Sequence, residues 1–213
     1  ITGVGIVVPL LPVFAHNLGA SGLYISMIFG AFAFSRTLLL PFIGPLSDKK
    51  GRKPFIVWGL FIYALVSLAY MFTESVNVLI FIRVFQGFAS AAIMPVTQAY
   101  IGDLTPKGKE GFTMGLFNLS MYGSFSLGPL IGGYLNDNYG IKYAFLFMGI
   151  LALMGFALSQ IMLPPVSEEK FKPKSFTKTT LFKLLKQPTI FALFSFRTAY
   201  TVCIGTLWSF LPV

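Results

Sequence analysis

The chain has 213 residues, of which 55% are hydrophobic and only 11% are charged, and its formal net charge is +9. A soluble domain carries about 25% charged residues, so this composition excludes an ordinary water-soluble protein and is typical of a helical membrane protein. The excess of Lys and Arg does not indicate nucleic-acid binding, because most of these residues fall in short polar segments between long apolar ones. We therefore expect a multi-pass protein embedded in a lipid bilayer.

Seven apolar segments predict seven transmembrane helices, because a helix needs about 20 apolar residues to cross a bilayer and satisfies its own backbone hydrogen bonds. The first segment is short and the sequence does not begin with Met, so we expect a truncated first span and a fragment of a longer protein. The predicted spans are residues 1–15, 23–43, 55–72, 76–101, 112–134, 143–163 and 190–212.

The loops alternate in charge. Twelve Lys or Arg residues fall in the segments 47–53, 103–110 and 166–186, against one in the opposite loops. This bias places the three basic segments in the cytoplasm, so the first and the seventh spans both run outward. A seven-helix receptor has the opposite orientation, and a scaffold that transports nothing would not need charged residues inside its spans.

The spacing of the spans predicts three regions. We expect a six-span bundle over 1–163, a basic cytoplasmic linker over 164–189, and a seventh span over 190–213 that opens a second bundle. The linker suits either a short helix on the membrane surface or a solvated connection.

The loop after the second span reads G-x-L-S-D-x-x-G-R-K from Gly44 to Lys53. We expect Gly44 and Gly51 to allow close helix approach and a tight turn. We expect Asp48 to hold Arg52 and to cap the amino terminus of a helix, either its own or a neighbouring one.

This pattern resembles the loop signature of the major facilitator superfamily of secondary transporters. The resemblance implies that the loop gates the cytoplasmic side, and that an acid at the end of the fourth span, Asp103, pairs with the basic loop.

The fourth span contains R-x-x-Q-G-x-x-x-A, beginning at Arg83, and this also resembles a signature of the superfamily. Arg83, Gln86 and Gly87 share one helix face. The resemblance implies a proton relay or a substrate contact in the central cavity, because a guanidinium inside a span is normally aimed at a cavity or a partner. The alternative is an arginine that binds buried carbonyls and braces the bundle.

The fifth span contains Gly128-Pro129-x-x-Gly132-Gly133, which resembles the signature of the drug:proton antiporter branch. Ser124 stands where that signature has a further glycine. Pro129 removes a helix hydrogen bond and the glycines allow a neighbour to approach, so we expect a bend or a tight seam here.

The sequence also repeats itself at an offset of 89 residues. The pattern G-x-L-x-D-x-x-G-x-K begins at Gly44 and again at Gly133, once after an inward span and once after an outward span. This arrangement predicts two three-helix units of opposite topology.

Three arginines are expected inside spans, whereas all seven acids lie at span ends or in loops. A charged side chain that faces lipid has a high energetic cost, so charged and polar residues within spans are candidates for a substrate cavity. If the protein is proton-coupled, the residue that binds and releases the proton is Asp48, Asp103 or a residue outside this sequence. The candidate cavity residues are Arg36, Gln98, Asn118, Tyr122 and Arg197.

The resemblance implies an all-α fold, namely the six-helix amino-terminal bundle of a twelve-helix carrier and the first helix of its second bundle. It implies a monomeric secondary transporter in the plasma membrane that moves a small molecule by alternating access, with protons as the coupling ion. A drug-type efflux antiporter for amphipathic or cationic molecules is the leading hypothesis. Because the intramembrane charges are positive, a carrier of a metabolite such as a sugar or an organic anion stays open.

The sequence has no nucleotide-binding loop, metal-ligand cluster or nucleophile–base set. We therefore expect no enzyme activity, no metal and no cofactor.

Overall fold

The computed structural model describes residues 2–164 and 186–210, and these residues form α-helices joined by short turns. The expected all-α fold is confirmed. The predicted linker falls mainly on residues 165–185, which lie outside the described residues. The helices are α1 (Thr2–Asn17), α2 (Gly22–Lys50), α3 (Arg52–Met71), α4 (Val76–Leu104), α5 (Glu110–Tyr139), α6 (Ile141–Met162) and α8 (Pro188–Phe210).

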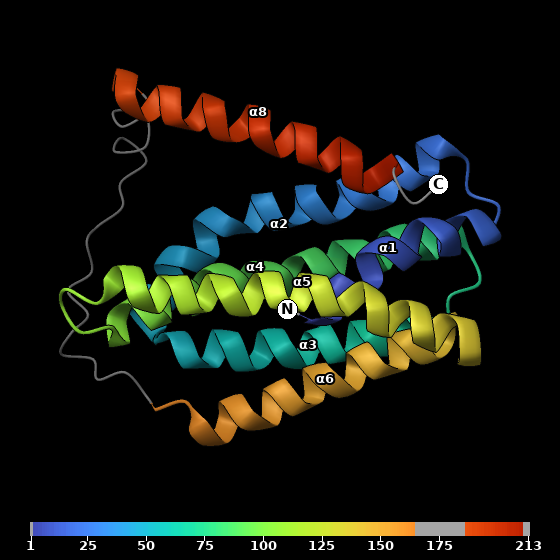
Figure 1. Cartoon of the computed structure of the whole chain (residues 1–213), viewed down its shortest axis with the longest axis horizontal. Coiled ribbons are helices and arrows are strands. Elements are labelled where there is room, and N and C mark those ends of the chain that lie inside the picture. The colour runs from blue at the N-terminus through green and yellow to red at the C-terminus, as the bar shows by residue number, and fades with distance from the viewer. Residues whose placement is uncertain (1, 165–185, 211–213) are drawn as a thin grey trace.

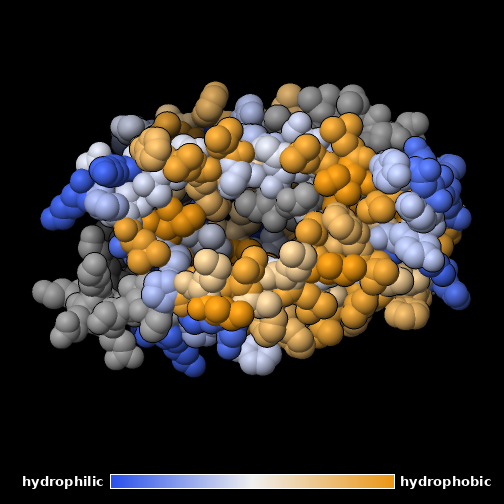
Figure 2. Space-filling model, turned by 60° about the horizontal axis from the view of Figure 1, so that its bottom comes forward, coloured by the Kyte–Doolittle hydropathy of each residue, from blue (hydrophilic) through white to orange (hydrophobic). Residues whose placement is uncertain are grey.

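The helices lie side by side along the long axis of the molecule (Figure 1). The turns α2–α3 and α4–α5 lie at one end, and the turns α1–α2, α3–α4 and α5–α6 lie at the other (Figure 1). Hydrophobic residues cover most of the face in Figure 2, between two ends that carry strongly hydrophilic residues. This is the distribution that a membrane-spanning bundle requires, because the apolar middle matches the hydrocarbon core.

Four described helices, α2, α3, α4 and α6, are long and apolar enough to cross a membrane. The apolar part of α1 is shorter, over Gly5–Asn17. α5 has 30 residues, but serines, asparagines and glycines make it more polar. A helix is present at each of the seven expected places, although length and composition alone identify only four as candidate spans.

The turn between α2 and α3 is much shorter than the predicted loop over 47–53. α2 continues to Lys50 and α3 begins at Arg52, so Gly51 alone separates them. Gly51 has φ 85° and ψ 149°, and Gly140, 89 residues later, has φ 91° and ψ 159° between α5 and α6. This backbone region is almost restricted to glycine, so each glycine stops one helix and lets the next begin.

Four helix pairs make the main contacts of the bundle: α2 with α4, α3 with α6, α3 with α4, and α1 with α5. Buried aromatic side chains pack near one end of the bundle, where the rings of Tyr70 and Phe145 stack with centroids 4.8 Å apart. Phe14 of α1 meets the edge of Phe145 at 5.2 Å. These large side chains join α1, α3 and α6 through many weak van der Waals contacts.

Glycines set two of the helix crossings. A side chain at Gly87 of α4 would overlap the hydroxyl of Ser35 of α2. In the same way, a Cβ at Gly128 of α5 would lie 2.6 Å from the carbonyl carbon of Gly5 of α1, and one at Gly5 would lie 2.8 Å from the oxygen of Ser124. Ser35 and Ser124 are 89 residues apart, so the repeated sequence coincides with a repeated packing position.

Candidate functional site

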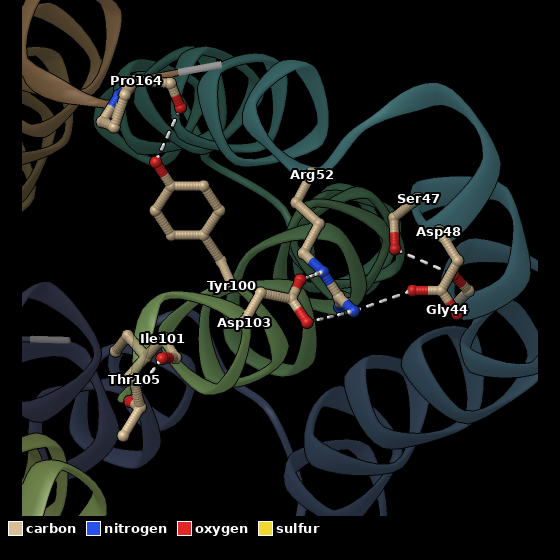
Figure 3. Close-up of polar contacts among 9 residues, drawn as sticks. All are labelled: Gly44, Ser47, Asp48, Arg52, Tyr100, Ile101, Asp103, Thr105 and Pro164. Carbon is tan, nitrogen blue, oxygen red and sulfur yellow. Dashed lines mark hydrogen bonds and ion pairs between the residues drawn. The ribbon is translucent and has the colours of Figure 1, made fainter. Parts of the chain in front are cut away.

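A charged cluster at one end of the bundle joins three helices. Arg52, the first residue of α3, lies between Asp48 of α2 and Asp103 of α4 (Figure 3). Its Nε donates to Asp103 Oδ2 at 2.5 Å, and its Nη2 lies 3.0 Å from Asp48 Oδ1. The Arg52 side chain is 12% exposed, whereas those of Asp48 and Asp103 are 50% and 33% exposed. We call these three residues the Arg52 cluster.

Neighbours of the Arg52 cluster bind the end of α6. Lys53 donates from Nζ to the carbonyl of Gln160 at 2.8 Å. Tyr100, one turn before Asp103, donates from its hydroxyl to the carbonyl of Pro164 at 2.8 Å (Figure 3). These bonds satisfy carbonyls at the carboxy-terminal end of α6 and just beyond it, where the helix itself supplies no donor.

Two expectations about this loop are wrong. Gly44 lies inside α2, and a Cβ there would meet no described atom within 4 Å, so no close helix approach occurs at this residue. Asp48 lies in the last turn of α2, and the amino-terminal cap of α3 is Gly51 without a side-chain hydrogen bond. Asp48 therefore holds Arg52 but cannot cap its own helix, and neither α3 nor α5, which begin at this end, has a side-chain cap hydrogen bond. The tight turn at Gly51 is present.

A second polar cluster lies inside the bundle, around Gln86 of α4. The Gln86 amide oxygen accepts from Arg83 Nη1 at 2.6 Å and from the hydroxyl of Tyr70 at 2.7 Å. The Gln86 amide nitrogen donates to the hydroxyl of Tyr63 at 2.9 Å. We call these four residues the Gln86 cluster. All four side chains are buried, so these hydrogen bonds satisfy polar groups that would otherwise need water as a partner.

The Arg83 guanidinium is only partly satisfied. It lies over the rings of Phe29 and Phe32 of α2, with Cζ 5.2 Å and 4.9 Å from the ring centroids. Arg83 is 4% exposed, and its Nε has no hydrogen-bond partner. Its described contacts are the buried amide oxygen of Gln86 and two aromatic faces, so they fit both the alternative in which Arg83 braces the bundle and a role in a cavity.

The candidate cavity residues lie in different environments. Arg36 of α2 is half-buried and lies opposite Gly87, whereas the other four are exposed on the surface of the bundle and α8. Arg36 does not contact any of these four, and they do not form a single site in the described part of the chain. The four exposed residues are Gln98 of α4, Asn118 and Tyr122 of α5, and Arg197 of α8.

The fifth-helix residues divide into two groups. Gly128 and Gly132 are buried against α1, where a Cβ at Gly132 would lie 3.1 Å from Ile6. A Cβ at Gly133 would meet no described atom within 4 Å. α5 continues without interruption through Pro129. The signature therefore forms a tight seam with α1, to which Gly133 contributes no contact.

The sequence reasoning missed Tyr63 and Tyr70. Both lie on α3, whose apolar segment carries no charge. They are seven residues apart and so share one helix face, and this spacing of two hydroxyls in an apolar helix was the available signal. No comparable signal marked Ser35, because its importance lies in its close contact with Gly87 of another helix.

These features define a helical membrane protein. Its described charges lie at the helix ends, except for Arg83 in the buried polar cluster, Arg36 within α2 and Arg197 within α8. The chain belongs to the Major Facilitator Superfamily, whose family model matches residues 1–213. The predicted family membership and fold are thereby confirmed.

Similar proteins support this assignment. The chain is 35% identical to an uncharacterized MFS-type transporter of Methanocaldococcus jannaschii, over 99% of the chain and 56% of that protein. It is 30% identical to the quinolone resistance protein NorA of Staphylococcus aureus, over 94% of the chain and 54% of NorA. The chain thus spans about half the length of these relatives.

A solved structure has the same fold. The crystal structure of the human organic anion transporter MFSD10 (TETRAN) superposes with a TM-score of 0.68. The superposition covers 81% of the chain and 46% of that structure, at 21% sequence identity. At this identity the likeness concerns the fold alone.

Proposed function

We propose that this chain forms the amino-terminal bundle of a secondary transporter that exports amphipathic small molecules by alternating access. The protein works as a proton-coupled, drug-type antiporter in the plasma membrane, as a monomer. The similarity to NorA and the glycine–proline pattern of α5 support the drug-type branch. The coupling ion, the membrane and the direction of transport belong to the same proposal.

The Arg52 cluster carries this proposal. Alternating access needs a contact at one end that forms in one state and breaks in the other. Ion pairs with partly exposed carboxylates suit this task, because solvent screens them, and a solvent-screened pair contributes only about 0–1 kcal/mol and breaks easily. Asp48 is half exposed, so its carboxylate has room for a further partner from the second bundle when the cytoplasmic end closes.

The same cluster offers a link to protons. Protonation of Asp48 or Asp103 removes the negative half of an ion pair with Arg52 and weakens the join between α3 and its neighbours. Within the described residues, these are the carboxylates that form ion pairs. Proton binding and release at this end would therefore bias opening and closing.

Transport by the full-length protein in everted membrane vesicles tests the proposal. We would follow uptake of a fluorescent amphipathic dye under an imposed pH gradient, with Asp48→Asn as the variant. Asp137→Asn is the matched control, because Asp137 occupies the repeated position at the opposite end and forms no ion pair among the described residues. Gradient-dependent uptake that is lost in Asp48→Asn and kept in Asp137→Asn supports the proposal. Absence of uptake by well-folded wild-type protein contradicts it.

A further inference from the structure

Arg83 and Arg36 leave positive charge in the bundle without a described counterion. The described carboxylates lie at the helix ends, and those that form ion pairs do so with Arg52. Neither intramembrane arginine of the bundle forms an ion pair with a described residue. A guanidinium stays protonated even when it is buried, so this charge cannot be removed by losing a proton.

The two arginines lie on facing surfaces of α2 and α4. Gly87 is one turn from Arg83, and a Cβ at Gly87 would lie 3.1 Å from the backbone nitrogen of Arg36. Phe32 is one turn before Arg36, and its ring lies against the Arg83 guanidinium. The two residues are therefore within about one helical turn of each other across the α2–α4 crossing.

Tyr63 of α3 is linked to Arg83 through Gln86, whose amide oxygen accepts from Arg83 and whose amide nitrogen donates to the Tyr63 hydroxyl. A tyrosine hydroxyl that already accepts a hydrogen bond from Gln86 supplies a dipole but no negative charge. Two like charges about one helical turn apart repel each other, and a single anionic group placed between them would relieve this repulsion.

We propose that Arg36 and Arg83 form a binding site for the anionic group of an amphipathic molecule, most simply a carboxylate. The unpartnered Nε of Arg83, on a side chain only 4% exposed, supplies a donor that is already desolvated. Arginine binds carboxylates through parallel hydrogen bonds, which adds geometric selectivity. Phe29 and Phe32 supply an apolar, aromatic wall beside the charge.

The inference rests on the proposed transport function and names its substrate class. Arg36 is half-buried, so the site reaches the surface of the bundle through this residue. α2 lies between α4 and α8 (Figure 1), which puts the site on the side of the bundle where α8 packs. The anionic group comes either from the transported molecule or from a carboxylate of the protein outside this sequence, and the test separates these two sources.

The test uses the full-length protein in detergent and two probes that differ in one group. A xanthene dye with a free carboxylate and the methyl ester of the same dye are compared by equilibrium dialysis, without a pH gradient. Wild-type protein is expected to bind the acid at least about tenfold more tightly than the ester, since a hydrogen bond to a charged group is worth about that factor. Arg36→Gln should abolish this preference, Arg36→Lys should retain most of it, and Lys142→Gln at the exposed start of α6 should not change it.

The remaining outcomes are equally specific. If the protein supplies its own carboxylate, wild type binds both dyes equally, and Arg36→Gln lowers the melting temperature whereas Arg36→Lys does not. Equal binding of the dyes with no change of melting temperature in Arg36→Gln or in Arg83→Gln overturns the proposal. Dialysis measures binding without transport, so this proposal and the transport proposal can fail separately. Loss of dye uptake in Asp48→Asn with an intact preference for the acid shows a defect in transport and not in binding.

Discussion

Arg52 of α3 and Asp103 of α4 are 51 residues apart in sequence, yet the Nε of the first donates a hydrogen bond to the carboxylate of the second. The second amino group of Arg52 reaches Asp48 in the last turn of α2. One guanidinium thus joins the ends of three helices at the side of the molecule where the basic turns lie.

Removal of the Asp103 charge separates a gating role from a structural one. In Asp103→Asn, we expect the free energy of unfolding to fall by no more than about 1 kcal/mol, because the carboxylate is partly exposed and solvent screens the ion pair. Dye transport should fall about tenfold or more. Glu110→Gln, at the first residue of α5 at the same end, is the control and should affect neither quantity. Unchanged transport in Asp103→Asn would remove Asp103 from the gate.

The close contact between α1 and α5 predicts different effects of substitution at two glycines of α5, Gly128 and Gly133. In Gly128→Ala, the added methyl group would lie 2.6 Å from the backbone of Gly5, so a helix must move. We expect a loss of about 1–3 kcal/mol in stability, seen as a lower melting temperature of the full-length protein. Gly133→Ala should be neutral or slightly stabilising, because its methyl group meets no described atom. Equal effects of the two changes would show that the seam is wrongly placed.

The Gln86 cluster predicts different costs for two similar changes. Tyr63→Phe removes the acceptor of the Gln86 amide nitrogen and leaves that donor buried, so we expect a loss of about 1–3 kcal/mol. Tyr70→Phe leaves the Gln86 oxygen still bonded to Arg83, so we expect only about 0.5–1.5 kcal/mol. Thermal unfolding of both variants in the same detergent measures the difference. A larger cost for Tyr70→Phe would contradict this hydrogen-bond arrangement.

The repeated glycines Gly51 and Gly140 should respond alike to substitution. Both have a positive φ that other residues adopt at a cost of about 1–3 kcal/mol, so Gly51→Ala and Gly140→Ala should each lower the melting temperature. Gly44→Ala, within α2 and free of described neighbours, should be neutral or stabilising by up to about 1 kcal/mol. Destabilisation by Gly44→Ala that matches Gly51→Ala would show that close packing at Gly44 occurs after all.

The sequence predicted the family and the all-α fold because long apolar segments and the loop signature at Gly44–Lys53 depend on local composition and spacing. It misjudged where α2 ends, because Lys49 and Lys50 read as a loop but still continue the helix until Gly51 breaks it. It missed Tyr63 and Tyr70, since their role depends on Gln86 of another helix. Contacts between distant segments, such as Gly128 with Gly5, are not encoded in any local pattern.

The most direct test of the account is a charge exchange between Arg52 and Asp103, measured as gradient-driven dye uptake in everted vesicles. Arg52→Asp and Asp103→Arg should each reduce uptake strongly, because each places two like charges together. The double exchange rebuilds the ion pair with its direction reversed, and we expect it to restore a substantial part of the uptake, although the pair with Asp48 is lost. Uptake by either single variant at the wild-type level would contradict a gate built on this ion pair.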